Sequence, residues 1–122
     1  MPEKSTKNDL LFLVATPLGF HVRVTRSYWD LIVTMKHPVM QGREHDVQNA
    51  LRFPDEIRLS RSDPNVYLFY KSENMQRWVC AVTKRLNGEG FLITTYPTDA
   101  IKEGGTLSVT TRRPPYRPFG PD

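Results

Sequence analysis

The chain contains a single cysteine, Cys80, among its 122 residues. One cysteine excludes an intramolecular disulfide and a metal cluster held by several thiolates of the same chain. Because Cys80 lies between Val79 and Ala81, we expect a buried structural thiol, which suits a chain in the reducing cytoplasm.

Long apolar segments are also missing. The longest apolar run, Leu10 to Ala15, is far shorter than the roughly 20 residues that span a membrane, so we expect no membrane contact. Residues 1–9 include acids and have no apolar core of the kind found in secretory signals. These absences together predict a cytoplasmic protein.

The motifs of common enzyme classes are absent as well. The sequence has no glycine-rich phosphate loop, no Gly-x-Ser-x-Gly elbow and no pair of carboxylates at a catalytic spacing. Of the three histidines, His37 and His45 are eight positions apart, which does not place two ligands on one helical face. We therefore predict neither a metal site nor a cofactor.

Basic residues outnumber acidic ones by 17 to 13, so the net charge is +4. This balance permits binding to nucleic acid or to an acidic partner. The charge is spread thinly, however, and no segment is a basic block that would bind nucleic acid unaided.

The length of the chain suits one domain. We predict a flexible arm over residues 1–9, a single domain over residues 10–104 and an Arg/Pro-rich flexible tail over residues 105–122. Four of the ten prolines lie after Arg112, and such a composition favours an extended conformation over packing.

The sequence of the first half of the domain predicts a hairpin and two helices. Apolar residues alternate over residues 20–25, and a turn joins this segment to a short strand over residues 12–16. Ser27 is the predicted N-cap of a helix that ends before Pro38. The spacing of Tyr28, Leu31, Ile32 and Met35 predicts its apolar stripe, which Trp29 and Val33 widen, and a second helix is expected over residues 43–52.

From residue 55 the spacing of apolar residues changes from the period of a helix to the alternating period of a strand. Strands are predicted near residues 57–60, 66–71, 76–84 and 90–96, with short polar connections that favour antiparallel pairing. We therefore predict an α+β fold in which two N-terminal helices pack on one face of a roughly four-stranded antiparallel meander.

Several side chains could carry chemistry, and each has an ordinary structural alternative. Lys36 and His37 can stabilise the negative end of the helix dipole, or His37 can transfer protons. Arg58 and Ser60 share one strand face, where they can hold a phosphate or simply face solvent. The same choice holds for Thr94, Thr95 and Tyr96 at the end of the last strand.

The aromatic residues of the strands can stack on bases, but alternating aromatics are more typical of a core. We expect core positions for all five of them, with Trp78 on a central strand: Tyr67, Phe69, Tyr70, Trp78 and Phe91.

A series of short motifs follows in order along the chain: Tyr28-Trp29, Lys36-His37-Pro38, Gly42-x-Glu44, Pro54-Asp55-Glu56-Ile57-x-x-Ser60, Val66 to Tyr70, and Gly90 to Tyr96. Together they span roughly residues 24–104. In this order they resemble a small bacterial group related to phage-associated nuclease domains of the barnase–EndoU–colicin–RelE (BECR) type.

The resemblance implies two helices on a four-stranded antiparallel sheet and metal-independent cleavage of RNA, often by toxins that a cognate antitoxin protein restrains. In such cleavage the 2′-hydroxyl attacks the adjacent phosphate, with a base and an acid moving the protons. The residues that match the recurrent polar positions are His37, Arg58, Ser60, Thr95 and Tyr96 as catalytic candidates, with Lys71 and Lys84 as substrate-binding additions. The chain has neither the sheet-borne acid and histidine pair of barnase nor the two histidines and lysine of EndoU enzymes.

We therefore predict a ribonuclease in which His37 is the general acid or base, Arg58 stabilises phosphate charge, and Ser60 and Thr95 orient the substrate. The alternative is a non-catalytic interaction module that binds a protein partner. An enzyme requires His37, Arg58 and Thr95 to lie within a few ångströms of one cleft, whereas a binding module does not.

Overall fold

The computed structural model describes residues 9–101 and residues 105–106. Apart from Asp9 and the dipeptide 105–106, the predicted N-terminal arm and C-terminal tail lie outside the described residues. The described elements are β1 (Leu10–Ala15), β2 (His21–Thr25), α2 (Arg26–Leu31), η1 (Ile32–Lys36), η2 (Pro38–Met40), α3 (Glu44–Arg52), β3 (Glu56–Leu59), β4 (Val66–Asn74), β5 (Arg77–Leu86), β6 (Glu89–Thr98) and β7 (Gly105–Thr106).

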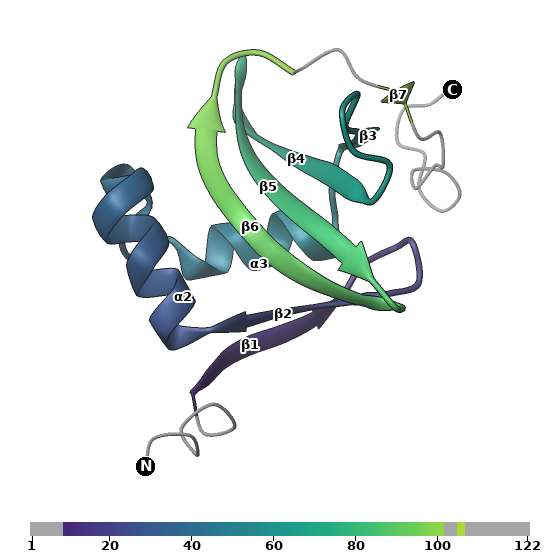
Figure 1. Cartoon of the computed structure of the whole chain (residues 1–122). Coiled ribbons are helices and arrows are strands. Elements are labelled where there is room, and N and C mark those ends of the chain that lie inside the picture. Colours follow the sequence, from purple (N-terminus) through teal and green to yellow (C-terminus); the bar gives the residue numbers. More distant parts are fainter. Residues whose placement is uncertain (1–8, 102–104, 107–122) are drawn as a thin grey trace.

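The strands form one mixed sheet in the order β1-β2-β6-β5-β4-β3-β7. All neighbouring strands are antiparallel except β2 and β6, which run parallel. Figure 1 shows the β1–β2 hairpin lying along one end of the long curved strands, with α3 behind β5 and β6.

The predicted fold of two N-terminal helices on a four-stranded antiparallel meander is therefore wrong. The hairpin of β1 and β2 precedes the helices and extends the sheet beyond β6. A parallel partner can be reached only through a long crossover, and the helices together with β3, β4 and β5 provide that connection. Hydrophobic periodicity predicts strands, but it does not indicate which distant strand each one will join.

Gly90 is the residue that permits the parallel pair. It lies opposite Val22, and a Cβ atom at this position would lie 2.7 Å from the Phe20 ring and 2.8 Å from the His21 carbonyl oxygen. Real Cβ atoms do not come so close to backbone, so only glycine fits between the two strands.

The first helical segment begins two residues earlier than predicted. Thr25 is the N-cap, and its side chain accepts a hydrogen bond from the Tyr28 backbone N–H at 3.2 Å. Ser27, the predicted cap, instead donates its hydroxyl to the Asp9 carboxylate at 2.6 Å. This arrangement ties the start of β1 to the start of α2.

The buried stripe of this segment also differs from the prediction. Leu31 and Met35 are 44% and 71% exposed, against the prediction, whereas Trp29, Ile32 and Val33 are buried as predicted. The helix changes from α to π geometry at Ile32, where the wider turn rotates the following side chains. The second helix, α3, lies close to the predicted range and buries its short apolar face.

The sheet has two apolar faces. We call the side that packs against the helices the helix face and the other side the open face. The main core joins the helix face, the helices and the hairpin, and complete burial of one of its side chains such as Phe69 contributes about 1.5–3 kcal/mol. The open face carries a smaller cluster, formed by Leu68, Tyr70 and Cys80 with Val66, Trp78, Val82, Tyr96 and Ile101 packed around them.

A β-bulge in β6 decides which of its side chains reach the open face. Val82 pairs with Thr94 and Thr83 pairs with Leu92, so Ile93 is an extra residue without a cross-strand partner. The Ile93 carbonyl oxygen instead accepts hydrogen bonds from the Tyr28 hydroxyl at 2.7 Å and from Lys36 Nζ at 3.3 Å. The bulge thus anchors the first helical segment to the sheet.

Candidate functional site

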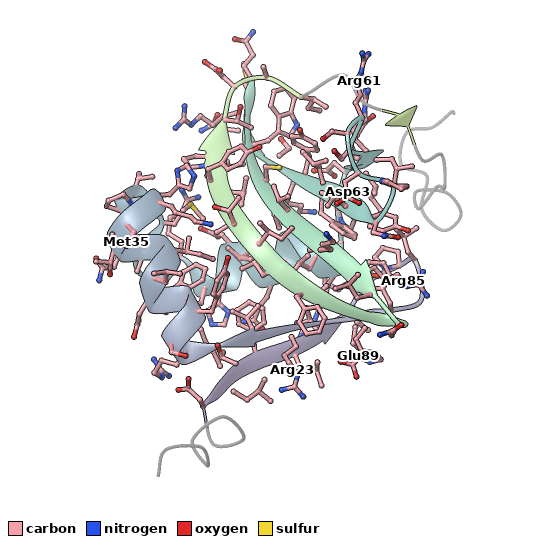
Figure 2. All side chains as sticks on the ribbon, in the orientation of Figure 1. Arg23, Met35, Arg61, Asp63, Arg85 and Glu89 are labelled. Atoms are coloured by element: carbon pink, nitrogen blue, oxygen red, sulfur yellow. The ribbon has the colours of Figure 1, made fainter. Side chains whose placement is uncertain are left out.

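A cavity of about 490 Å³ lies on the open face of the sheet. It extends from the end of β3 and the following loop across β4 and β5 to β6. Figure 2 shows Arg61 and Asp63 in that loop, at the side of the sheet away from α2. The cavity is lined by Arg58, Leu59, Ser60, Arg61, Ser62, Val66, Leu68, Val82, Thr94 and Tyr96.

Strand register places Arg58 at this cavity. Arg58 lies opposite Leu68, Leu68 opposite Val82, and Val82 opposite Thr94, which makes one row across four strands. Arg58 donates from Nε to the Glu56 carboxylate at 2.8 Å, and both side chains are partly exposed. The ion pair occupies the Nε donor and leaves the other guanidinium nitrogens for a ligand, so Glu56 is placed to orient Arg58.

The loop after β3 supplies hydroxyl groups and a second guanidinium. The Ser62 backbone N–H donates to Ser60 Oγ at 3.2 Å, and the Asn65 N–H donates to Asp63 Oδ1 at 2.9 Å. Asp63 also pairs with Lys84 Nζ of β5 at 3.1 Å. These local bonds and the ion pair hold the loop beside the sheet, so that Ser60, Ser62 and Arg61 line the cavity.

Tyr96 closes the other end of the cavity. Burial raises the pKa of its phenol, and the nearby Cys80 and Tyr70 raise the pKa further. Tyr96 therefore remains a neutral hydroxyl at physiological pH, and it is hydrogen-bonded to the Cys80 side chain beside the cavity. The His37 ring lies 5.3 Å from the Tyr96 ring between centroids, with the planes tilted by 46°.

The structure does not bring Thr95 to the cavity. Thr95 is fully buried on the helix face, and its hydroxyl donates to the Cys80 carbonyl oxygen at 2.8 Å. Its neighbour Thr94 lines the cavity instead, with Oγ1 buried and without a hydrogen-bond partner among the described residues. Three sequence candidates (Arg58, Ser60 and Tyr96) thus share one cavity, and His37 touches it only through the Tyr96 ring.

The two lysine candidates lie apart from each other. Lys71 pairs with Val79 across the strands and is therefore on the helix face, where its Nζ lies 3.9 Å from Asp55 Oδ1. Lys84 is on the open face, next to the cavity but not in its lining. Only Lys84 is placed to meet a ligand that occupies the open face.

Sequence reasoning missed Glu56, Arg61 and Ser62, and it considered Thr94 without selecting it as a site residue. Glu56 and Ser62 follow from the same period of two that relates Arg58 to Ser60, so extending that alternation in both directions would have found them. Of the predicted core aromatics, Phe69 and Tyr70 are fully buried, Trp78 is half-buried on the open face, and Phe91 is 37% exposed. The core prediction is therefore wrong for Phe91.

Comparison of the chain with models of known families, with curated proteins and with solved structures finds no match in any of the three. The BECR resemblance therefore stays a prediction. The described residues contain no group of three or more His, Cys, Asp or Glu side chains placed to hold a metal ion. Each helix of the described chain is too short or too polar to cross a bilayer.

Proposed function

We propose that the domain is a metal-independent endoribonuclease that holds a phosphodiester of its RNA substrate in the Arg58–Tyr96 cavity. The observation that carries the proposal is the composition of the cavity: it combines two arginines, two serine hydroxyls and a neutral tyrosine hydroxyl. Guanidinium groups bind phosphate oxygens through paired hydrogen bonds, and hydroxyls complete the contacts.

Arg58 is the group proposed to stabilise the charge that develops on the phosphate. Its pairing with Glu56 holds the guanidinium in one orientation, which favours a preorganised contact over a flexible one. Ser60 and Tyr96, on opposite sides of the cavity, are proposed to orient the substrate oxygens.

His37 is the proposed general acid or base. Its ring contacts the Tyr96 ring, with 5.3 Å between the centroids, so the reacting 2′-hydroxyl or leaving oxygen must bind at the Tyr96 end of the cavity. Histidine suits this role because its ordinary pKa is near 6.5. A cognate antitoxin protein would restrain the enzyme by covering the open face.

A second candidate function is a binding module that uses the same cavity without cleaving its ligand. One specific observation favours it: none of the ten lining residues is a histidine or a carboxylate. Proton transfer therefore depends entirely on His37, which contacts the Tyr96 ring but does not line the cavity.

One experiment separates these functions. The purified protein is incubated with a broad pool of RNA in EDTA, and cleavage is expected to leave 2′,3′-cyclic phosphate ends because the attacking oxygen belongs to the substrate. We expect His37→Ala to lower the rate by about 10²–10⁴-fold, and Arg58→Ala to lower it as well.

Arg52→Ala is the matched control, because Arg52 is an exposed arginine at the end of α3, on the helix side of the sheet. Its rate should equal that of the wild type. Binding without cleavage, with affinity lost in Arg58→Ala, would favour the binding module. If the wild type neither binds nor cleaves any RNA of the pool, both functions are wrong.

A further inference from the structure

A second cavity, of about 470 Å³, opens on the same face of the molecule. Strands β2 and β6 pair at only two positions and then separate, and Tyr28 of α2 fills the gap between them. The cavity lies over this gap and is mostly apolar. Its lining residues are Arg23, Val24, Thr25, Tyr28, Lys84, Leu86, Phe91, Leu92 and Ile93.

An exposed aromatic ring lies between two cations at this cavity. Phe91 pairs with Arg23 of β2 on one side and with Lys84 of β5 on the other, so the three side chains form a row across three strands. Phe91 is 37% exposed, and the neighbouring Leu86 is 44% exposed. The open part of the Phe91 ring between two cations is suited to stacking on a base whose flanking phosphates meet the cations.

The two cavities adjoin each other along the sheet. Val82 lines the first cavity and Lys84 the second, and these residues are alternate positions of β5, about 7 Å apart. On β6, Thr94 lines the first cavity and its neighbour Ile93 the second. An extended chain can therefore lie across both cavities without leaving the open face.

The charges around the row are compatible with a polyanion. Lys84 Nζ lies 3.1 Å from Asp63, but both side chains are partly exposed, so a phosphate can replace the carboxylate. Glu89 lines a third cavity together with Arg23 and is exposed to solvent. With Arg58 and Arg61 in the first cavity, the path carries four cations, Arg23, Lys84, Arg58 and Arg61, against the three carboxylates of Glu56, Asp63 and Glu89.

From this arrangement we infer that the Arg23–Phe91–Lys84 row is a base-stacking subsite for single-stranded RNA. One base stacks on Phe91, its flanking phosphates contact Arg23 and Lys84, and the neighbouring phosphodiester occupies the Arg58–Tyr96 cavity. The inference rests on the proposed function, since the RNA reaches the row from that cavity. It requires a single strand, because the bases of a duplex are not free to stack on a side chain.

The inference is tested by fluorescence anisotropy with a labelled single-stranded RNA of about eight nucleotides, a length within the usual range for single-strand binders. Phe91→Ala is expected to lower the affinity about fivefold to a hundredfold, the range for loss of one stacked base. Phe91→Leu keeps apolar bulk without a ring and should show a similar loss, whereas Phe91→Trp should bind like the wild type.

Phe53→Ala is the control, because Phe53 is 61% exposed at the end of α3, away from the open face. Its affinity should be unchanged. If Arg58→Ala weakens binding but Phe91→Ala and Phe91→Leu do not, the stacking subsite is wrong and the proposed function stands. Equal affinity of the wild type for the single strand and for its duplex would also overturn the subsite, and no affinity for either would overturn both proposals.

Discussion

Thr94 and Thr95 offer a matched pair of substitutions with opposite expected effects on stability. They are adjacent on β6 and have the same side chain, but they lie on opposite faces of the sheet. The Thr94 hydroxyl is buried and has no hydrogen-bond partner among the described residues, whereas the Thr95 hydroxyl donates to the Cys80 carbonyl oxygen at 2.8 Å. Valine has the same shape as threonine without the hydroxyl.

Thr94→Val should raise the free energy of unfolding. An unsatisfied buried hydroxyl costs about 1–3 kcal/mol, and we expect a gain of about 1 kcal/mol, at the lower end of that range. Thr95→Val should lower the free energy of unfolding by about 1 kcal/mol through the lost hydrogen bond. The two variants should therefore differ by about 2 kcal/mol, with opposite signs relative to the wild type.

Urea denaturation followed by circular dichroism measures the difference. The urea dependence of the unfolding free energy should be the same in all three proteins, because threonine and valine expose nearly the same area when the chain unfolds. A Thr94→Val protein that is destabilised as much as Thr95→Val would refute the reasoning, since it would show that the Thr94 hydroxyl makes a hydrogen bond in the folded protein.

Three further predictions concern stability. Gly90→Ala should lower the unfolding free energy by at least about 1–3 kcal/mol in urea, because the new Cβ must push β2 from β6; an unchanged midpoint would show that the strands separate at no cost. Trp78→Ala should cost roughly 1–3 kcal/mol, less than for a complete core residue, because Trp78 is half-buried; a loss above that range would mean deeper packing. Hydrogen bonds from Ser27 lower the pKa of Asp9, so their stabilisation is present above the ordinary carboxyl pKa and is lost as pH falls through the lowered one. Asp9→Asn should therefore be less stable than the wild type at pH 7, and the two thermal midpoints should converge in acid; a constant difference would contradict this linkage.

Sequence patterns predicted the helices and strands well where a single local feature, such as an apolar face or a proline, determines the element. The range of α3 follows from a short apolar face that Pro54 terminates, and the hairpin of β1 and β2 follows from alternation around Pro17 and Gly19. The position of Arg58 and Ser60 on the open face follows from the opposite burial of Ile57. Each of these features depends on residues that are close in sequence.

The errors have a different origin, because they depend on distant contacts or on a single inserted residue. The parallel pair of β2 and β6 depends on the absence of a side chain at Gly90. Local periodicity indicates only that a glycine at this position is a poor strand former. The position of Thr95 on the helix face was not predicted, because the bulge at Ile93 shifts by one residue the alternation of β6 side chains between the two faces. The face on which each later β6 side chain lies depends on the position of that bulge.

The parallel pair also has a consequence for the order of folding. Val22 and Gly90 are separated by more than half of the chain, so β2 cannot find its partner until nearly the whole domain has left the ribosome. During synthesis the β1–β2 hairpin must wait with its β2 edge unpaired, while β4, β5 and β6 can assemble from local antiparallel contacts. An unpaired strand edge is a site for aggregation, so the yield of folded protein should depend on how quickly the hairpin docks on β6.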